Sequence, residues 1–294
     1  MQIAVASGKG GTGKTIVSTS LALCAPGPVQ YLDCDVEEPN GHLFLKPELA
    51  SHERYTVIVP EILQDKCTYC GKCRDLCRYN AIAMFANTVM TFPEMCHSCL
   101  GCFRVCPEDA IARGEREIGV LESGMAGDIS FVHGRTRVGE AMGVPLLRAV
   151  KKRAVHGETV DEDKKSLVII DAPPGTSCPF VAAITGVDYV ILVTEPTPFG
   201  LHDLKLAAEV VHNFSIPCGV IINRSDLGDD RVELWCAQEN IPVLLKIPFD
   251  RKIAEGYARG LSMVESAPEL RPVLQSLLAS LMAEYGNGLK LGTK

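Results

Sequence analysis

The chain has 294 residues, of which 47% are hydrophobic and 22% are charged, and it carries a formal net charge of −7. This length and apolar content allow a substantial core with room for one inserted module, so we expect a soluble two-domain protein. The acidic balance offers no basic surface for nonspecific DNA binding, which excludes a nucleic-acid partner from our expectations.

The first predicted element is a phosphate-binding loop. An apolar strand at residues 3–6 leads into Ser-Gly-Lys-Gly-Gly-Thr-Gly-Lys-Thr at residues 7–15, and a helical stretch follows at residues 16–24. In this context G-x4-G-K-[ST] binds phosphate through converging backbone N–H groups and the helix N-terminus. We expect Lys14 to neutralise the β- and γ-phosphates of ATP and the Thr15 hydroxyl to bind Mg²⁺. The other loop residues expected at the nucleotide are Gly8, Gly10, Gly11, Thr12 and Gly13.

The second predicted strand, residues 30–35, ends in two carboxylates, Asp33 and Asp35. In a parallel sheet the C-terminal ends of the strands line the ligand crevice, so both side chains are expected near the phosphates. An aspartate at a strand end is, by itself, more often a turn or helix cap. The order and spacing of the motifs therefore carry this assignment.

Residues 67–106 hold eight of the thirteen cysteines, in two copies of the spacing C-x2-C-x2-C-x3-C. This is the bacterial ferredoxin pattern for two [4Fe–4S] clusters, and the constant offset between the copies indicates an internal repeat. Because the fourth cysteine of each run is typically a ligand of the other cluster, the eight residues divide into two crossed sets. The first set is Cys67, Cys70, Cys73 and Cys106, and the second is Cys96, Cys99, Cys102 and Cys77.

Disulfides and zinc are the alternative roles for these cysteines. Disulfides require an oxidising compartment, but Met1 leads directly into the apolar strand without a signal-peptide pattern, so we expect a cytoplasmic protein. Zinc usually takes two C-x2-C pairs, whereas the third and fourth cysteines of each run fit a cubane better than a tetrahedron. Clusters are therefore the favoured interpretation, and zinc is the remaining alternative.

After the cysteine runs, residues 114–139 are predicted to form a hairpin region that joins the two modules. Residues 167–175 then form a buried strand that ends in Asp171 and is followed by Gly175. The same reasoning about parallel strands places the Asp171 carboxylate with those of the strand at residues 30–35.

The remaining predicted elements complete an alternating pattern of strands and helices. Apolar strands are predicted at residues 189–194, 218–223 and 243–248, with a helix at residues 201–212. The terminal helix around residues 273–282 has apolar residues on one face and lacks the lysine-rich polar side of a membrane anchor. We expect it to pack on the core, and we expect no membrane partner.

The loop Lys9-Gly10-Gly11-Thr12-Gly13-Lys14-Thr15, with a lysine near its start, resembles the deviant Walker A motif of the MinD/ParA superfamily. That superfamily includes the nitrogenase iron protein, Mrp-type iron–sulfur carriers and the arsenite-pump ATPase. The strands at residues 30–35 and 167–175 match the same family in the expected order. The resemblance implies a homodimer that forms on ATP binding, in which Lys9 reaches the nucleotide of the partner subunit.

The resemblance also implies individual roles at the nucleotide. Asp35 positions or activates the attacking water, and Asp171 holds Mg²⁺ through its water shell. Gly175 lies near the γ-phosphate, and Asp33 serves either Mg²⁺ or only the loop. Asn223, at the end of a predicted strand, resembles the segment that reads the adenine base, although an asparagine there is also an ordinary turn residue.

The predicted fold is therefore an α/β P-loop ATPase with a mostly parallel sheet, formed by residues 1–60 and 113–294. A small α+β domain of the bacterial ferredoxin type, residues 61–112, interrupts it between the two aspartate-bearing strands. The expected cofactors are two [4Fe–4S] clusters, ATP and Mg²⁺.

Three tasks are open for such a protein: ATP-gated electron transfer, assembly or delivery of a metallocluster, and regulation or positioning of the ParA and MinD kind. A carrier needs a labile cluster, often shared across a dimer by a separate C-x2-C pair, and no such pair exists outside residues 67–106. Electron transfer is therefore favoured, with an unidentified redox or metallocofactor partner protein.

Overall fold

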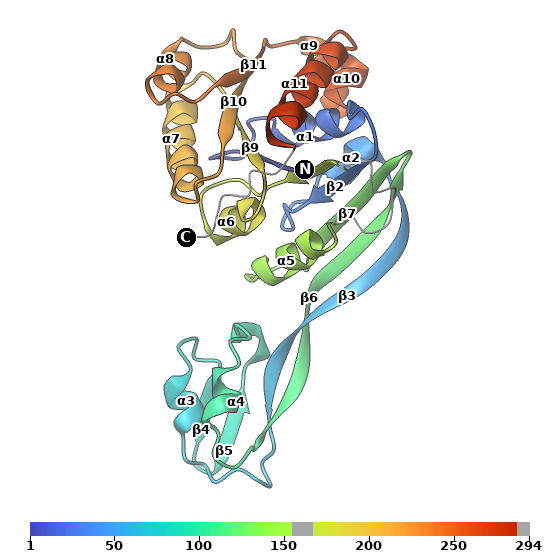
Figure 1. Ribbon diagram of the computed structural model, residues 1–294. Coiled ribbons are helices and arrows are strands. Elements are labelled where there is room, and N and C mark those ends of the chain that lie inside the picture. The colour runs from blue at the N-terminus through green and yellow to red at the C-terminus, as the bar shows by residue number, and fades with distance from the viewer. Residues whose placement is uncertain (155–166, 287–294) are drawn as a thin grey trace.

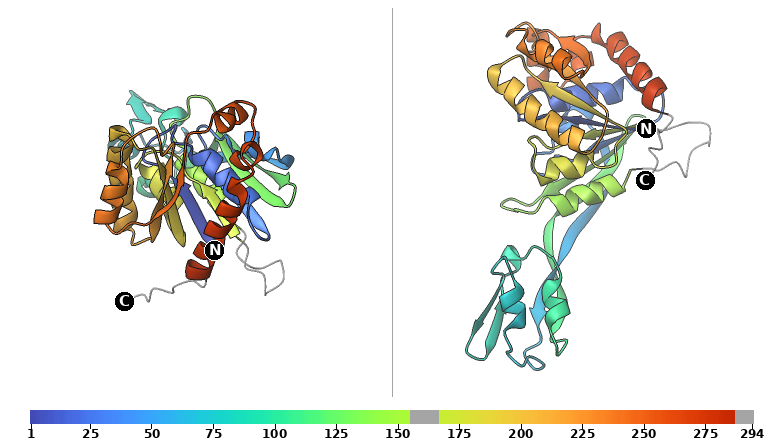
Figure 2. Two further views of the ribbon diagram at one scale, coloured as in Figure 1. Left: turned by 90° about the horizontal axis from the view of Figure 1, so that it is seen from above. Right: turned by 60° about the vertical axis from the view of Figure 1, so that its left-hand side comes forward.

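The computed structural model describes residues 1–154 and 167–286, so parts of the predicted 113–294 segment, residues 155–166 and 287–294, lie outside the described residues. The chain forms a large body and a small cysteine-rich module, residues 63–110. A long two-stranded ribbon joins the two parts and holds the module away from the body (Figures 1 and 2).

A mostly parallel sheet forms the centre of the body, as the sequence predicts. Among the described residues it has nine strands in the order β11-β10-β9-β1-β8-β2-β7-β6-β3. Neighbours from β11 to β7 are parallel, whereas β6 is antiparallel to both β7 and β3. The strands are β1 (Gln2–Ala6), β2 (Val29–Asp33), β3 (Glu48–Ile62), β6 (Ile111–Ala126), β7 (Ile129–Thr136), β8 (Leu167–Asp171), β9 (Tyr189–Thr194), β10 (Cys218–Asn223) and β11 (Val243–Ile247).

Both faces of this sheet are covered by helices, because alternate residues of each buried strand point to opposite sides. In β1, Ile3 and Val5 belong to one apolar cluster, and Ala4 and Ala6 to the other. The first cluster includes residues of α1, α10 and α11, and the second those of α5 to α8. The helices of the body are α1 (Lys14–Leu23), α2 (Gly41–Leu45), α5 (Val144–Lys152), α6 (Cys178–Ile184), α7 (Pro198–Asn213), α8 (Arg231–Gln238), α9 (Arg251–Ala258), α10 (Met263–Ser266) and α11 (Leu270–Tyr285).

The terminal helix α11 packs on the core as expected, through Leu274, Leu278 and Leu281. Residues three or four positions apart lie on the same face of a helix, so these three leucines pack against the core together. No helix within residues 1–154 and 167–286 combines the length and the apolar character needed to cross a bilayer.

The ribbon consists of β3 and β6, which remain paired beyond the end of β7. The pairing of β6 with β7 ends at Gly119 and Thr136, but β3 and β6 stay paired out to Ile62 and Ile111, with a register shift between Tyr55 and Thr56. Pro60, where the sequence predicts the first part of the body to end, therefore lies inside β3, and the predicted return at residue 113 lies inside β6. Both strands run without interruption from the body into the module.

The module is a small α+β unit in which the two cysteine runs occupy equivalent places. Each run is followed by a short strand or ribbon segment and contains a one-turn helix, and these helices contact each other. Its elements are α3 (Lys72–Leu76), β4 (Ile82–Phe85), β5 (Thr88–Thr91), a 3-10 turn (Pro93–Met95) and α4 (Gly101–Val105).

Candidate functional site

The glycine-rich loop joins β1 to α1 and contacts the end of β10. Gly13 has φ of +90°, a left-handed conformation that favours glycine, and a Cβ atom there would lie 2.4 Å from Asn223 Nδ2. The same amide donates a hydrogen bond of 2.9 Å to the Thr12 carbonyl oxygen. The structure therefore brings Asn223 against the loop, with its amide engaged by the loop backbone.

Lys14, the first residue of α1, is buried among carboxylates from two other strands. Its Nζ donates a hydrogen bond of 2.7 Å to Asp171 Oδ1 and lies 3.7 Å from Asp35 Oδ2. Burial alone would lower the pKa of Lys14, but the charges of Asp171 and Asp35 raise it above its ordinary value. Lys14 is therefore a cation at neutral pH, and Thr15 follows it in the first turn of α1.

Asp33 and Asp35 follow one another at the end of β2 but have different surroundings. Asp33 is fully buried and accepts hydrogen bonds from the backbone N–H of Asp35 (3.2 Å) and of Gly41 (2.8 Å). These bonds fix the turn between β2 and α2, so the structure supports the loop role among the two expected for Asp33. The Asp35 carboxyl is partly exposed, and burial with the nearby Asp171 raises its pKa to about 6, although Lys14 opposes the rise.

A tyrosine that the sequence analysis did not single out completes the contacts of Asp171. Tyr31 donates its hydroxyl to Asp171 Oδ2 at 3.2 Å and shares a hydrogen bond of 2.9 Å with the Ser18 hydroxyl. Tyr31 precedes Asp33 by two positions on β2, so its side chain points to the same face, and this alternation was the available signal. Gly175, in the segment after β8, contacts the first residue of the glycine-rich loop, because its N–H donates to the Ser7 carbonyl at 3.0 Å.

Lys9 lies apart from the carboxylates that surround Lys14. Its side chain is 33% exposed, and its ammonium is 4.0 Å from Glu195 Oε2, which also has Arg224 as an ion-pair partner at 2.7 Å through Oε1. An exposed lysine in a weak ion pair can reorient toward another charge at small cost.

A cavity of about 370 Å³ lies beside the loop, next to Asn223 and Arg224. Its other walls come from the segment after β11 and from α9, so it combines an apolar floor with a few polar groups, which suits a nucleobase. The sequence did not lead us to predict these walls, although the apolar and aromatic residues after the last strand indicate an apolar surface there. They include Pro248, Phe249, Ile253 and Tyr257, and Ile16 of α1 and Met263 of α10 also line the cavity.

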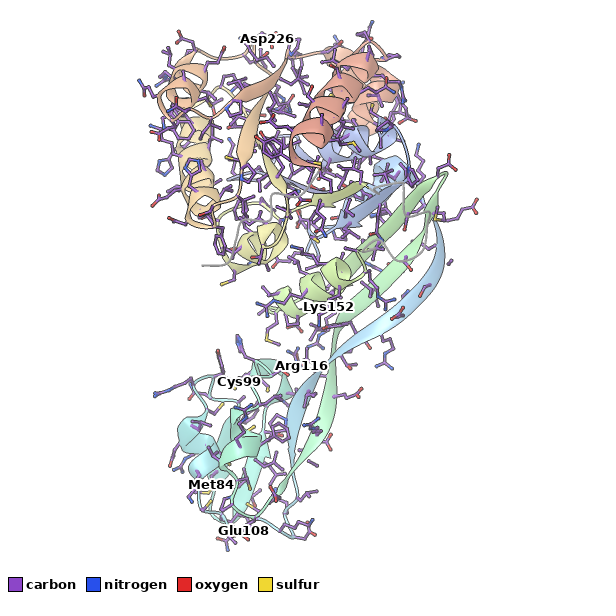
Figure 3. All side chains as sticks on the ribbon, viewed as in Figure 1. Met84, Cys99, Glu108, Arg116, Lys152 and Asp226 are labelled. Carbon is purple, nitrogen blue, oxygen red and sulfur yellow. The ribbon has the colours of Figure 1, made fainter. Side chains whose placement is uncertain are left out.

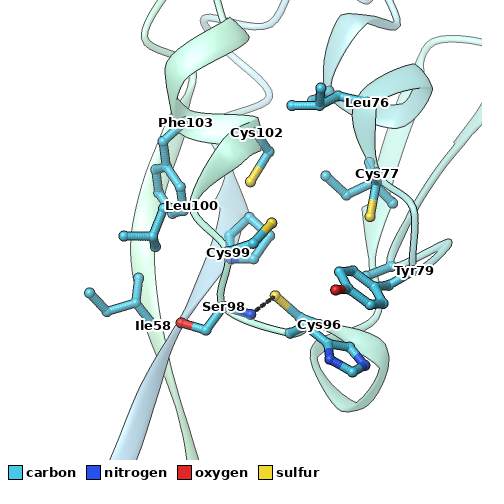
Figure 4. A pocket seen from close by; sticks show the side chains of 15 residues that line it. Ile58, Leu76, Cys77, Tyr79, Cys96, Ser98, Cys99, Leu100, Cys102 and Phe103 are labelled. Atoms are coloured by element: carbon cyan, nitrogen blue, oxygen red, sulfur yellow. Dashed lines mark hydrogen bonds between the residues drawn. The ribbon is translucent and has the colours of Figure 1, made fainter. Parts of the chain in front are cut away.

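The second run of cysteines surrounds a cavity at the side of the module nearer the body, which we call the proximal thiol site. Cys77 of the first run joins Cys96, Cys99 and Cys102, and the four sulfur atoms face a common space (Figure 4). Ile58 and Pro60 of β3 form part of the wall.

The first run surrounds another cavity, the distal thiol site, with Cys106 of the second run completing the set. It is bordered by Cys67, Cys70, Cys73 and Cys106, together with Ile62 and Ile111 at the outer end of the ribbon. Cys73 also borders the proximal cavity. Each site is thus lined by cysteines from both runs.

The two thiol sites fit [4Fe–4S] clusters in their donor set and in their hydrogen bonds. Backbone N–H groups point at sulfur in both, from Ser98 to Cys96 Sγ at 3.4 Å and from Ala110 to Cys106 Sγ at 3.3 Å. Hydrogen bonds to the sulfur ligands are one of the features by which a protein tunes such a cluster. No three Cys, His, Asp or Glu side chains in the described ranges converge as the ligands of one metal ion do. A cubane is wider than a single ion, so its four thiolates lie farther apart.

Comparison with known proteins relates the whole chain to nucleotide-binding domains. The family model of the CobQ/CobB/MinD/ParA nucleotide binding domain (CbiA) matches residues 3–263. An uncharacterized protein of Methanocaldococcus jannaschii is 30% identical over 287 residues, which cover 96% of both chains. The septum site-determining protein MinD of Pyrococcus horikoshii, solved with Mg-ADP, has a TM-score of 0.55 at 21% identity and covers 99% of both chains.

A shorter similarity concerns an iron–sulfur protein. Ferredoxin-1 of Chlorobaculum tepidum is 33% identical over 58 residues, which are 18% of this chain and 94% of that protein.

Proposed function

Because the chain belongs to the CobQ/CobB/MinD/ParA nucleotide-binding family, we propose that it is a Mg²⁺-dependent ATPase whose nucleotide state, in a homodimer, controls electron transfer through two [4Fe–4S] clusters. The observation that carries the redox part is the grouping of eight thiols around two cavities in a module of its own. Residues 61–112 would thus be an inserted ferredoxin-like domain, and residues 1–60 and 113–294 the ATPase.

The nucleotide half of the proposal uses the loop and the carboxylates around it. Backbone N–H groups of residues 8–13 bind the phosphates, and Lys14 balances their charge when its ammonium turns from Asp171 to ATP. The released Asp171 carboxylate and the Thr15 hydroxyl are then placed for Mg²⁺ and its water shell. The short bond between Lys14 and Asp171 supports this exchange of partners.

Hydrolysis requires a water in line with the γ-phosphate, and Asp35 is the carboxylate best placed to orient it. Asp33 is fully buried and holds the turn, whereas Asp35 is partly exposed and lies 3.7 Å from the loop lysine. Gly175, bonded to the first residue of the loop, lies close enough for its backbone to approach the same phosphate. The cavity next to Asn223 receives the base.

Dimerisation is assigned to Lys9. Its partial exposure and weak pairing with Glu195 support a side chain that leaves its own subunit and reaches the partner subunit's nucleotide. ATP then links the two subunits, because the phosphates receive a charge from each.

In the module, Cys77, Cys96, Cys99 and Cys102 would hold the proximal cluster, and Cys67, Cys70, Cys73 and Cys106 the distal one. When bound, each cluster supplies one-electron transfer, taking an electron from a reduced donor protein and returning it to an oxidised acceptor protein. The N–H groups of Ser98 and Ala110 stabilise the negative charge on the sulfur ligands. Apolar side chains such as Ile58, Leu76 and Phe103 exclude water from the proximal site.

The test is the midpoint potential of each cluster in anaerobically purified protein, titrated without nucleotide, with Mg-ADP and with Mg-ATP. We expect at least one potential to differ between the ADP and ATP states, and we expect Lys14→Ala to abolish that difference. Identical potentials in all states would overturn gated electron transfer. Transfer of iron and sulfide to an apo-protein acceptor under the same conditions would then favour the delivery role.

A further inference from the structure

Four charged side chains form an ion network at the junction between the module and the body. Arg116, on the ribbon, pairs with Glu140 of the body and lies 3.5 Å from Glu94 of the module. Arg137 of the body pairs with Glu94 and also lies 3.3 Å from Glu140. We call Arg116, Glu94, Arg137 and Glu140 the junction network. It joins side chains of the module, the ribbon and the body, and Figure 3 shows Arg116 on the ribbon between the two parts.

Arg116 also contacts the proximal thiol site directly. Its Nη2 donates a hydrogen bond of 3.5 Å to the backbone carbonyl of Cys96, two positions beyond Glu94. The guanidinium therefore holds the segment that begins the second cysteine run. Its fixed planar geometry lets one side chain bind a carboxylate and a carbonyl at the same time.

On the body side, the network leads to the segment that follows Asp35. Glu140 accepts a hydrogen bond of 3.0 Å from the Met142 N–H and so fixes the loop at residues 137–143. The strand before this loop is bonded to the chain after β2, because the Thr136 N–H donates to the Val36 carbonyl at 2.8 Å. Val36 is the next residue after Asp35, which lies 3.7 Å from the loop lysine. A series of hydrogen bonds and ion pairs along these segments thus connects the nucleotide loop to Cys96.

The network is built to hold one arrangement at a time. The side chains of Arg116 and Glu140 are only 5% and 2% exposed. A buried charge that loses its partner is strongly disfavoured, so these two groups stay together and move together, unlike an exposed pair. The pair of Arg54 and Glu117 on the same ribbon lacks this property, since the two side chains are 72% and 35% exposed.

We infer that Arg116 is a positioning residue that transmits the nucleotide state from the segment after Asp35 to the proximal thiol site. A shift of Val36 displaces Thr136 and with it the loop at residues 137–143. Glu140 belongs to this loop and moves Arg116 through their ion pair. Arg116 then displaces the backbone at Cys96 through its hydrogen bond to the carbonyl. This coupling rests on the proposed function only in one respect, namely that the displacement at Cys96 serves to control electron transfer.

Hydrogen exchange of the cluster-loaded full-length protein tests this coupling without an activity measurement. Peptides that cover residues 93–98 are compared in the Mg-ADP state and in the state with a non-hydrolysable ATP analogue. We expect a difference of at least about twofold in exchange rate for the wild type, and none for Arg116→Met or Glu140→Gln. The matched control, Arg54→Met on the same ribbon, should keep the difference.

A double variant controls for the possibility that the single substitutions lose the exchange difference because the junction misfolds. Arg116→Met/Glu140→Met removes both charges, a change that buried ion pairs often tolerate, and it should retain iron, ATP binding and ATP hydrolysis within about threefold. Loss of the exchange difference in this variant supports the coupling. Persistence of the difference in the variants, or its absence in the wild type, overturns it.

The two proposals fail in different ways. An exchange difference that depends on Arg116, found together with unchanged cluster potentials, would leave the coupling standing and remove gated electron transfer. Potentials that shift with nucleotide equally in wild type and in Arg116→Met would do the opposite.

Discussion

The ammonium of Lys14 lies 2.7 Å from the carboxylate of Asp171, and both side chains are almost fully buried. Because the two charges compensate each other out of contact with water, the pair links the loop at the start of the chain to a strand at its centre. Removing one partner leaves the other as an uncompensated buried charge.

Substitution of Lys14 by alanine should therefore lower both stability and ATP affinity, whereas the same change at Lys9 should not. Breaking a buried pair costs about 3–5 kcal/mol, while an exposed pair contributes about 0–1 kcal/mol. We expect Lys9→Ala to bind ATP as a monomer but to lose ATP-induced dimerisation and hydrolysis. Chemical denaturation, ATP titration and sedimentation compare the two variants. Equal loss of ATP affinity in both would show that Lys9 has no separate role.

Asp35→Ala should trap the ATP-bound dimer. Positioning the attacking water contributes to the transition state more than to binding, so hydrolysis should fall by about a hundredfold or more while Mg-ATP affinity changes little. Phosphate release and gel filtration with ATP measure the two effects. Glu37→Gln, an exposed carboxylate two positions away, is the control and should hydrolyse ATP normally. A variant at Asp35 that neither hydrolyses nor dimerises would contradict the assigned role.

The rate of hydrolysis should rise with pH through about 6. Burial raises the pKa of the Asp35 carboxyl to about 6, and its ionised form is the stronger hydrogen-bond acceptor and the form that can act as a base toward water, so the active form predominates above that pH. The sign for stability is opposite. Because the folded-state pKa is raised, ionisation of Asp35 opposes folding, and its contribution falls as pH increases from 3.8 to about 6.

The pH profile of the turnover number at saturating Mg-ATP, measured between about pH 5 and about pH 8, checks this rise in rate, because the range covers both protonation states of Asp35. The residual activity of Asp35→Ala should show no rise around this pH. A flat profile in the wild type would mean that another group orients the water.

Alanine at Cys77 should damage the proximal cluster, although Cys77 is nearest in sequence to the ligands of the distal one. Alanine at Cys106 should damage the distal cluster, for the reciprocal reason. Two filled cubanes correspond to about eight iron atoms per chain, and each variant should approach half of that. Iron analysis with electron paramagnetic resonance of the reduced protein separates the two signals. A Cys77→Ala spectrum that lacks only the distal signal would refute the crossed arrangement.

The sequence predicts most of the body and of the nucleotide loop because short motifs determine them. The loop needs glycine where φ is positive, as at Gly13, and the carboxylates of Asp33 and Asp171 follow buried strands that are recognisable from their apolar runs. The apolar runs likewise predict β9, β10 and β11 to within one residue and α7 and α11 to within a few, whereas α8, α9 and α10 are not predicted.

The ribbon and the junction could not be predicted, because they depend on contacts between residues far apart in the chain. Nothing in the local pattern around Pro60 shows that β3 continues past it, since a proline is tolerated where its missing N–H faces away from the partner strand. The pairing of Arg116 with Glu140 depends on how the module is turned relative to the body, and so does the contact with Cys96.

The ribbon also bears on how the chain reaches its fold. β2 and β7 are neighbours in the sheet, although the whole module lies between them in the chain. Parallel pairing across a long loop is slow, because the loop loses conformational entropy before any contact forms. The antiparallel pairing of β3 with β6 closes that loop step by step, and once Glu48 lies opposite Met125, only short segments separate β2 from β7. The pairing of the two strands that carry the module thus also brings β2 and β7 close enough to join the two halves of the sheet.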